Sequence, residues 1–298
     1  MHGDGNGWVQ CDRGHQHWGR HGAAGLLLHT VDDDGIVRML LQHRAAWSHH
    51  GDTWGLPGGA RDSHEDATAA ALREAAEEAG VDLTRVRARH ASVEDHGGWS
   101  YTTVYADTPT PLATTPTHES AALAWLALDE VARRPLHPGF AATWPGLRPD
   151  PVVLLVDTAN VVGSRPDGWW RDRVGATTRL LTELAALRAV TARSTQDTVE
   201  VIASVVAVVE GAAAAARGPA WVRVVGAPTG GGASGDDVLV RIAAELVSDD
   251  RTVLAVTADR ALRSRLERLT GPSAHGSVQS VGPRWLRALL DESRRPQA

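Results

Sequence analysis

One stretch, from residue 58 to residue 81, constrains the fold of this 298-residue chain more than any other. An alanine-rich segment over residues 64–79 predicts a helix, because alanine has the highest helix propensity. Ser63 would cap its first turn, with Asp66 completing a capping box. Gly80 follows the last helical position, where a glycine in the left-handed conformation commonly ends a helix. The sequence therefore predicts a helix with defined ends in the first half of the chain.

Carboxylates would crowd one face of this helix. Glu74, Glu77 and Glu78 stand at positions i, i+3 and i+4 and share a face. They repel one another without a cation, whereas Mg²⁺ or Mn²⁺ would turn them into a set of oxygen ligands. Arg73 follows Glu65 by eight residues and could balance that carboxylate and orient the acidic face. A solvated acidic face is the alternative, but it does not explain the Gly-Gly pair before the helix or this eight-residue step.

The same stretch resembles the Nudix box. The box consists of a Gly, five residues, a Glu, seven residues, and then Arg-Glu-aliphatic-any-Glu-Glu-any-Gly-aliphatic. Its fixed and aliphatic positions are filled here by Gly59, Glu65, Arg73, Glu74, Ala75, Glu77, Glu78, Gly80 and Val81. So many fixed residues at fixed spacing are a specific signal, and the resemblance covers about residues 22–131.

The resemblance implies an α/β/α sandwich with a mixed sheet that hydrolyses a nucleoside diphosphate linked to another group. Divalent metals would polarise phosphoryl oxygens, activate a water and stabilise the leaving oxygen. The metal ligands implied for this chain are the carboxylates of Glu74, Glu77 and Glu78 and the carbonyl of Gly58. Supporting positions implied by the box are Gly59, Glu65, Arg73 and Gly80.

Two further residues outside the helix are candidates for this site. The general base would be either Glu78 or Glu119, since the base of this family can lie on a distal loop; Glu119 could equally be a surface acid. Arg44 could hold a substrate phosphate in bidentate fashion, or it could be an ordinary surface arginine.

The N-terminal segment, residues 1–21, is expected to be a leader. Cys11, His15, His17 and His21 bring four potential zinc ligands close together in the sequence. Structural zinc sites usually contain more cysteines, commonly in CxxC pairs, and Cys11 is the single cysteine of the chain. A partly ordered segment with surface histidines is therefore the alternative to a zinc site.

Prolines mark the expected domain boundary. Residues 133–151 contain five of them and predict a linker, because dense proline breaks both helix and sheet. Residues 22–132 would form the Nudix domain and residues 152–291 a second domain. The lone cysteine fits a reducing cytoplasm, no apolar stretch is long enough to span a membrane, and the net charge of −6 argues against a general nucleic-acid coat.

The second half alternates strands with helices, which predicts a parallel sheet covered on both faces. Asp157 and Asn160 end a buried strand, Asp236 and Asp237 open a helix, and Asp259 follows a further strand. Ligands bind beyond the carboxyl ends of parallel strands, so converging carboxylates there suggest Mg²⁺. Ordinary helix capping is the alternative; it explains Asp236 and Asp259 quite well, but Asp157 and Asn160 less well.

This half resembles the NYN domain of the PIN-like nucleases, in Val-Asp-Thr-Ala-Asn-Val, in Gly-Asp-Asp and in Thr-Ala-Asp-Arg-Ala-Leu-Arg. The resemblance maps the acids of that family onto Asp157, Asp236 or Asp237, and Asp259. One more acid is expected, with Glu183 and Glu210 as candidates. Arginines on one helix could contact RNA phosphates or could form a solvated face; they are Arg260, Arg263, Arg265 and Arg268.

The sequence as a whole predicts a two-domain cytoplasmic hydrolase that acts on a phosphoric anhydride bond of a nucleoside diphosphate derivative. The second domain would be a possible ribonuclease. Two other interpretations stay open: an RNA-processing nuclease whose Nudix half acts on RNA ends, and a regulatory protein that senses a nucleotide.

Overall fold

The computed structural model describes residues 3–193, 198–228, 234–270 and 276–294. The chain divides into two compact units, residues 1–148 and residues 149–298. Among the helices within the described ranges, none is both long and apolar enough to cross a membrane.

The first unit is built on a seven-stranded mixed sheet, with strands in the order β5-β4-β3-β8-β7, β6 paired with β3, and β9 paired with β4. Only the β3–β8 pairing is parallel among these pairs. The strands are β3 (Ala23–Val31), β4 (Val37–Arg44), β5 (Trp54–Gly55), β6 (Gly58–Ala60), β7 (Arg87–Asp95), β8 (Ser100–Asp107) and β9 (Ser120–Ala127).

Strand β3 forms because an unbroken apolar run is buried on both faces of the sheet. The turn that follows it is closed by Asp32, whose carboxylate accepts a hydrogen bond of 2.9 Å from the Ile36 amide. Gly35 takes the left-handed conformation that this turn requires, with φ of 77°. Strands β3 and β4 pair antiparallel on either side of this turn and form a hairpin.

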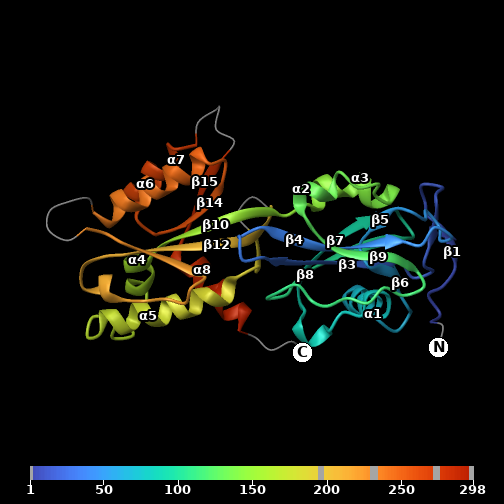
Figure 1. Ribbon diagram of the computed structural model, residues 1–298, viewed down its shortest axis with the longest axis horizontal. Coiled ribbons are helices and arrows are strands. Elements are labelled where there is room, and N and C mark those ends of the chain that lie inside the picture. The colour runs from blue at the N-terminus through green and yellow to red at the C-terminus, as the bar shows by residue number, and fades with distance from the viewer. Residues whose placement is uncertain (1–2, 194–197, 229–233, 271–275, 295–298) are drawn as a thin grey trace. The chain divides into compact units, whose positions relative to one another are not determined.

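Helices cover both faces of this sheet (Figure 1), with α1 on one face and α2 and α3 on the other. Small alanines on α1 let the helix approach the sheet closely, and Ala70, Ala71 and Ala75 are fully buried against the leucines of β3. The helices are α1 (Ala67–Ala79), α2 (Leu128–Val131) and α3 (Pro138–Leu147), with a 3₁₀ turn at Leu83–Arg85.

The start of α1 differs from the sequence prediction. Asp66 is its N-cap, and its carboxylate accepts a 2.8 Å hydrogen bond from the Ala69 amide. Ser63 does not cap the helix, because its amide and hydroxyl both donate to Asp4 in the N-terminal segment, at 2.9 and 2.5 Å. The predicted end is confirmed, since Gly80 is the C-cap with φ of 65°.

The proline-rich stretch expected to be a linker instead contains α3. A proline is tolerated in the first turn of a helix, where its missing N–H would be unpaired, and Pro138 lies there. The side chains of Phe140, Trp144 and Leu147 are buried. Upstream of α3, the Pro135 carbonyl accepts a 2.8 Å hydrogen bond from the amide of Trp54. Residues 133–148 thus belong to the first unit, and the boundary between units falls after residue 148.

The N-terminal segment is a small hairpin within the described residues. Strands β1 (Trp8–Gln10) and β2 (Gln16–Trp18) pair antiparallel as a two-stranded sheet. Short strands of this kind lack a periodic apolar signal, which is why the sequence predicted only a leader.

The second unit holds a six-stranded sheet in which β13, β12, β10, β14 and β15 run parallel in that order. The antiparallel β11 pairs with β12 and was not predicted. The strands are β10 (Asp150–Asp157), β11 (Thr191–Arg193), β12 (Val199–Val209), β13 (Val222–Gly226), β14 (Thr252–Val256) and β15 (Ser277–Val281).

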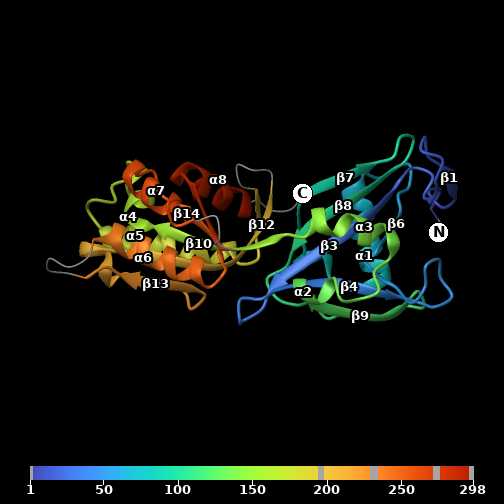
Figure 2. The ribbon, with the colours of Figure 1, turned by 90° about the horizontal axis from the view of Figure 1, so that it is seen from above.

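Helices cover both faces of this second sheet, as the alternating pattern predicted: in Figure 1, α6 and α7 lie on one side of β10 and β12 and α4 and α5 on the other, and Figure 2 shows the same unit from above. Helices α4, α5 and α8 contribute to one buried apolar cluster, and α6 and α7 to the other. They are α4 (Thr158–Gly163), α5 (Arg173–Leu184), α6 (Gly235–Ser248), α7 (Arg260–Glu267) and α8 (Pro283–Ser293), with 3₁₀ turns at Ala185–Leu187 and Gly211–Ala215. Because β10 is central, with β12 on one side and β14 on the other, the topological switch point lies at the carboxyl end of β10.

Candidate active site

Arg73 lies at the centre of the carboxylates on α1. Its guanidinium donates to both oxygens of Glu65, at 2.6 and 3.1 Å. It also donates to Glu74 at 2.8 Å and to Glu77 at 3.1 Å, and to the carbonyl of Ala60 on β6 at 2.9 Å. The hydrogen bond from Arg73 lowers the pKa of Glu65 and keeps that carboxylate charged. The expectation that Arg73 pairs with carboxylates is confirmed.

Glu78 is the most buried of the helix carboxylates, with 8% of the residue exposed. The Gly58 amide donates to its Oε2 at 2.9 Å, which ties the helix to β6. Burial raises the pKa of Glu78 to about 8, and the charges of Glu74 and Glu119 act in the same direction. The hydrogen bond from Gly58 and the charge of Arg44 oppose that rise.

Glu74 and Glu77 lie beside Glu78 but differ in exposure. Burial raises the pKa of Glu74, and the charges of Glu77 and Glu119 add to the effect. The Glu74 carboxyl group lies against Gly59, where an added Cβ would stand 2.7 Å from its carboxyl carbon. A glycine is therefore required at position 59 for Glu74 to hold this place. The Glu77 side chain is 61% exposed and reaches solvent.

The donor set of this cluster fits a hard divalent cation. Its acidic groups raise one another's pKa values, which is the behaviour of carboxylates held close without enough positive charge. All the donors are oxygens, which suits Mg²⁺ or Mn²⁺ better than softer metals. The carboxylates able to hold such an ion are Glu74, Glu77 and Glu78.

Arg44 and Glu119 lie near the same cluster. Arg44 is the last residue of β4; its charge lowers the pKa of Glu78, while its Nε donates to the His49 carbonyl at 3.2 Å. Glu119 stands just before β9, and its side chain is 49% exposed and lies 3.5 Å from His118. Both candidates from the sequence therefore lie within electrostatic reach of Glu78, and neither is buried.

Tyr101 is a residue of this site that the sequence did not reveal. Burial raises the pKa of its hydroxyl, and the charge of Glu78 adds to the rise. Its oxygen lies over Gly25 of β3, 2.1 Å from where a Cβ would stand, so only glycine fits beneath it. An isolated glycine in an apolar strand signals such a close approach, and Gly25 was the available clue.

A shallow depression of ≈ 330 Å³ adjoins Tyr101. Its walls come from β7, β8 and α3, and most of the lining side chains are small or polar. The lining residues are Ser92, Glu94, Tyr101, Thr103, Ala142, Thr143, Gly146 and Leu147. Tyr101 lines this depression, and its hydroxyl also lies within electrostatic reach of Glu78 and Glu74.

In the second unit, Asp157 ends β10 at the topological switch point. Its carboxylate accepts 3.0 Å hydrogen bonds from the Asn160 amide and from the Thr257 hydroxyl. Burial raises its pKa, with the charges of Asp236 and Glu210 adding to the rise. The Asn160 side-chain oxygen accepts a 2.9 Å hydrogen bond from the Ala258 amide, which joins the ends of β10 and β14.

The structure separates the acids that the sequence left as alternatives. The pKa of Asp236 is raised by burial first and then by the charges of Asp259 and Glu210, so Asp236 faces the other acids. Asp237 instead caps α6 with Ser234 and pairs with Arg265 at 2.6 Å.

The two candidates for a further acid, Glu183 and Glu210, lie in different surroundings. Glu210 follows β12, acts on Asp157 and accepts a 3.2 Å hydrogen bond from the Gly235 amide. Glu183 is engaged elsewhere, at 3.1 Å from Arg287 and 2.8 Å from Arg294. The acids that converge are therefore Asp157, Glu210, Asp236 and Asp259.

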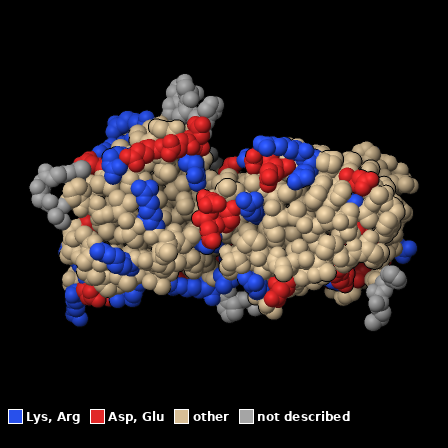
Figure 3. Space-filling view, viewed as in Figure 1, with Lys and Arg blue, Asp and Glu red and all other residues tan. Residues whose placement is uncertain are grey.

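Asp259 has a structural task besides its place in this group. It is the N-cap of α7, and its carboxylate accepts a 2.9 Å hydrogen bond from the Leu262 amide. Two of the arginines on α7 already have partners within the protein, since Arg263 donates to the Thr257 carbonyl at 2.8 Å and Arg265 pairs with Asp237. Figure 3 shows acidic and basic side chains side by side over the α6–α7 region, not a purely basic face.

Comparison with known proteins identifies the first unit. The model of the NUDIX domain matches residues 19–144. The chain is 53% identical over 160 residues to the putative 8-oxo-dGTP diphosphatase 3 of Mycobacterium tuberculosis, a match that covers 52% of this chain and 74% of that protein. A nucleoside triphosphate pyrophosphatase/Nudix hydrolase fusion protein of Bifidobacterium longum is 40% identical over 152 residues, covering 49% of this chain and 31% of its own length.

Among solved structures, the Nudix hydrolase RenU of M. smegmatis is 52% identical, with 48% of this chain and 93% of that chain covered and a TM-score of 0.47. With a relative this similar, three-quarters of which it covers, the chain belongs to the Nudix family. It is a hydrolase acting on phosphoric anhydride bonds.

Proposed function

We propose that the first unit hydrolyses a phosphoric anhydride bond of a nucleoside di- or triphosphate derivative, with Mg²⁺ or Mn²⁺ held by the α1 carboxylates. The observation that carries this proposal is the face of α1, where Glu74, Glu77 and Glu78 lie together and Arg73 braces two of them. The backbone carbonyl of Gly58 would complete the ligand set.

The relative's name suggests the first substrate to test. The protein of M. tuberculosis is named as a putative 8-oxo-dGTP diphosphatase, so an oxidised purine nucleoside triphosphate is our leading candidate. The depression beside Tyr101 would receive the nucleoside, because its small and polar lining leaves room for a flat ring with hydrogen-bonding edges. Arg44 would hold a phosphate group near Glu78.

The roles within the site follow from burial and charge. A bound divalent cation would supply charge stabilisation to the phosphoryl oxygens. Glu78 would take the proton of the attacking water, because it is buried beside the proposed metal ligands and the Gly58 amide holds its carboxylate in place. Glu65 and Arg73 would hold the helix face in place, and Glu119 would act only through its field, since its side chain is exposed.

The test is phosphate or diphosphate release from a panel of nucleoside phosphates, including 8-oxo-dGTP, with Mg²⁺. Glu77→Gln should lower turnover by roughly 100- to 1,000-fold, the effect of removing one charge-stabilising group. The matched control is Glu245→Gln, because Arg241–Glu245 is an exposed i, i+4 pair like Arg73–Glu77. Wild-type turnover in Glu77→Gln contradicts the proposal, and nucleotide binding without turnover in the wild type would favour a sensing role.

A second activity, PIN-like cleavage of RNA, is proposed for the second unit. The observation behind it is the convergence of Asp157, Asp236 and Glu210 where β10 meets its neighbours, together with the strand order of the sheet. Oxygen donors gathered at a switch point suit Mg²⁺ and a phosphate-bearing ligand.

The experiment uses one RNA with a nucleotide-capped end and the same RNA uncapped, each with Mg²⁺. Asp157→Asn should abolish internal cleavage while keeping the cap of α4, because asparagine caps helices as well as aspartate does. If the nucleotide at the RNA end is removed by the wild type but not by Glu77→Gln, RNA ends are also substrates of the first unit. If neither RNA changes while free nucleotides are hydrolysed, the second unit does not act on RNA.

A further inference from the structure

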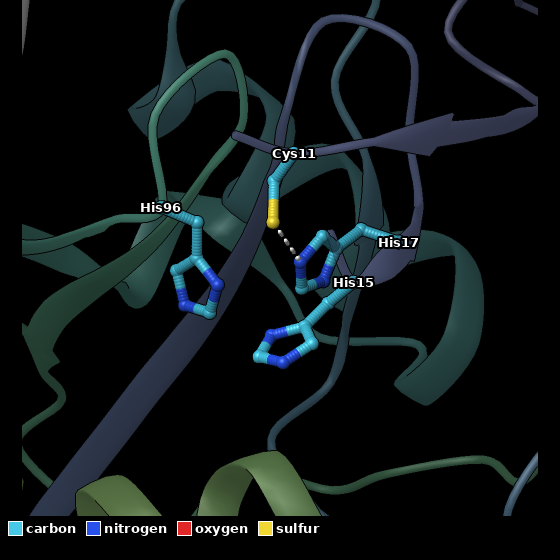
Figure 4. A group of neighbouring side chains, drawn as sticks. All are labelled: Cys11, His15, His17 and His96. Atoms are coloured by element: carbon cyan, nitrogen blue, oxygen red, sulfur yellow. Dashed lines mark hydrogen bonds between the residues drawn. The ribbon is translucent and has the colours of Figure 1, made fainter. Parts of the chain in front are cut away.

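A group of metal-ligating side chains lies outside both carboxylate sites (Figure 4). Cys11 directly follows β1, His15 directly precedes β2 and His17 lies within β2, whereas His96 comes from the loop between β7 and β8. One donor atom from each lies within 4.8 Å of all the others. Residues eighty positions apart in the chain thus supply four nitrogen and sulfur donors to one place.

The surroundings of His96 are those of a metal ligand. Its Nε2 lies 2.9 Å from the carboxylate of Glu94. Its Nδ1 is buried and has no hydrogen-bond partner among the described residues. Histidines that bind metals commonly donate their second ring nitrogen to a carboxylate, which fixes the tautomer and leaves the other nitrogen for the ion. The pairing with Glu94 therefore leaves Nδ1 as the donor atom.

The distance between two of the donor atoms fits a tetrahedral zinc centre. Bonds of about 2.3 Å to sulfur and about 2.0–2.1 Å to nitrogen separate tetrahedral ligand atoms by roughly 3.3–3.8 Å. The His17 Nε2 and the Cys11 Sγ are 3.3 Å apart. The ring of His17 is also held in orientation, because it stacks on Trp99 with centroids 3.9 Å apart and an interplanar angle of 8°.

The backbone already joins the two parts of this group. The Asp12 amide donates to the Gly97 carbonyl at 2.9 Å, and Arg13 donates to the Asp95 carbonyl at 2.6 Å. Gly97 adopts φ of 74°, which lets the loop turn toward the hairpin. The ligands are therefore brought together by hydrogen bonds that do not depend on an ion.

The hairpin buries too little apolar surface to be stable alone, so a metal ion bound between it and the β7–β8 loop would stabilise it. A two-stranded hairpin is at best marginally stable alone, and Trp8 and Trp18 are 51% and 45% exposed, so little apolar burial supports it. Yet the residues before it hold the loop that leads into α1, since Asp62 accepts from the Gly5 amide at 2.8 Å and Asp4 accepts from Ser63.

We propose that Cys11, His15, His17 and His96 bind one structural Zn²⁺, which fastens the N-terminal hairpin to the β7–β8 loop. Thiolate and imidazole donors suit zinc, and exposed His15 gives the ion a route in from solvent. The set differs from the one that the sequence suggested, because His96 takes the place of His21. This site is separate from the α1 carboxylates and does not depend on the proposed hydrolysis.

The test exploits the single cysteine of the chain. Protein stripped with a chelator and refilled with Co²⁺ should show a sulfur-to-cobalt charge-transfer band, which only Cys11 can produce. The histidine group His49, His50 and His137 and the group Asp4, Asp62 and His64 contain no sulfur and cannot give that band. Absence of the band in the folded full-length protein would overturn the proposal.

Single substitutions distinguish the proposed zinc ligands from a nearby histidine that does not bind the ion. Cys11→Ser should abolish the band, and His96→Ala should weaken Zn²⁺ binding, measured by competition with a chromophoric chelator. Glu94→Gln should weaken it by about 10- to 100-fold, the usual effect of removing a carboxylate behind a ligating histidine. His21→Ala is the control and should bind Zn²⁺ as the wild type does. Unchanged affinity in both His96→Ala and Glu94→Gln would contradict the site.

Hydrogen exchange tests whether bound Zn²⁺ stabilises the hairpin. Stripping the metal from the wild type should lower the protection of hairpin amides against hydrogen exchange, and adding Zn²⁺ should restore it. In Cys11→Ser, Zn²⁺ should restore nothing. Equal protection with and without Zn²⁺ in the wild type would show that hydrogen bonds alone hold the hairpin and would reject the structural role.

Discussion

The two carboxylate sites are assembled in opposite ways. In the first unit the acids come from one helix, and Arg73 supplies positive charge through hydrogen bonds to three carboxylates. In the second unit the acids come from separate strand and helix ends, and the partners of Asp157 are the uncharged Asn160 amide and Thr257 hydroxyl. A site on one helix is held by local sequence, whereas a site at strand ends is held by the whole sheet.

The largest effect is expected from Glu78→Gln. Glu78 is the most buried carboxylate of α1 and accepts a hydrogen bond from the Gly58 amide, so replacing it should lower nucleotide turnover by roughly 100- to 1,000-fold. Glu119→Gln should change turnover less than about tenfold, because its side chain is exposed and acts at a distance. Steady-state kinetics on both variants decide between these residues. A larger loss in Glu119→Gln would make Glu119 the base.

Arg73→Ala should destabilise the first unit by about 2–3 kcal/mol in free energy of unfolding. It would leave Glu65, whose side chain is 9% exposed, without its charged partner. The control Arg241→Ala breaks an exposed i, i+4 pair in the second unit and should cost only about 0.3–0.5 kcal/mol. Denaturant unfolding of both variants measures the difference. Equal small losses would mean that Arg73 does not hold the α1 face together.

Acid should weaken the first unit through His137. Burial lowers its pKa from 6.5 to about 4, and its neutral Nδ1 accepts a 3.2 Å hydrogen bond from the Gly139 amide at the start of α3. Because the unfolded chain binds more protons between these values, stability should fall as the pH drops from about 6.5 to 4.

The expected loss is about 2 kcal/mol, less than the whole shift because the ring is partly exposed. His137→Asn keeps a capping side chain and should flatten this pH dependence. The control is His118→Asn, whose histidine side chain is 80% exposed and should leave the profile unchanged. Unit-resolved hydrogen exchange at several pH values is the measurement. An unchanged profile in His137→Asn would assign the acid sensitivity to other groups.

The smallest effect is expected from Asp157→Asn in the second unit, and its sign is opposite to that of Arg73→Ala. Burial and neighbouring acids raise the pKa of Asp157, so its charge costs stability at pH 7. An asparagine keeps the cap and removes that charge, which should stabilise the unit by less than about 1 kcal/mol. Thermal unfolding tests this, and a clear loss of stability would mean that the charge serves the fold.

These differences explain what the sequence could predict. The C-cap of α1 was predicted because it depends on a continuous local pattern that ends at Gly80. The cap at Ser63 was wrong because that residue is engaged by Asp4, almost sixty positions away. The prediction of a linker in the proline-rich stretch was wrong because so many prolines hide the helical pattern of α3, in which Phe140 and Trp144 are buried.

The candidate sites follow the same division. The spacing of the α1 carboxylates in the sequence was enough to predict them. Tyr101 could not be predicted, because it reaches the site only through the pairing of β8 with β3 beside Gly25. In the second unit the sequence could not choose between Asp236 and Asp237, because neighbours on a helix differ only in which way they face. His96 was missed at the proposed zinc site because it lies far from the hairpin in sequence.

The most direct test of the account assays Glu77→Gln and Asp157→Asn side by side for nucleotide hydrolysis with Mg²⁺. Glu77→Gln should lose roughly 100- to 1,000-fold in turnover, and Asp157→Asn should hydrolyse nucleotides at the wild-type rate. Both variants should keep the far-ultraviolet circular dichroism of the wild type. Wild-type nucleotide hydrolysis in Glu77→Gln, or its loss in Asp157→Asn, would contradict the assignment of this chemistry to helix α1.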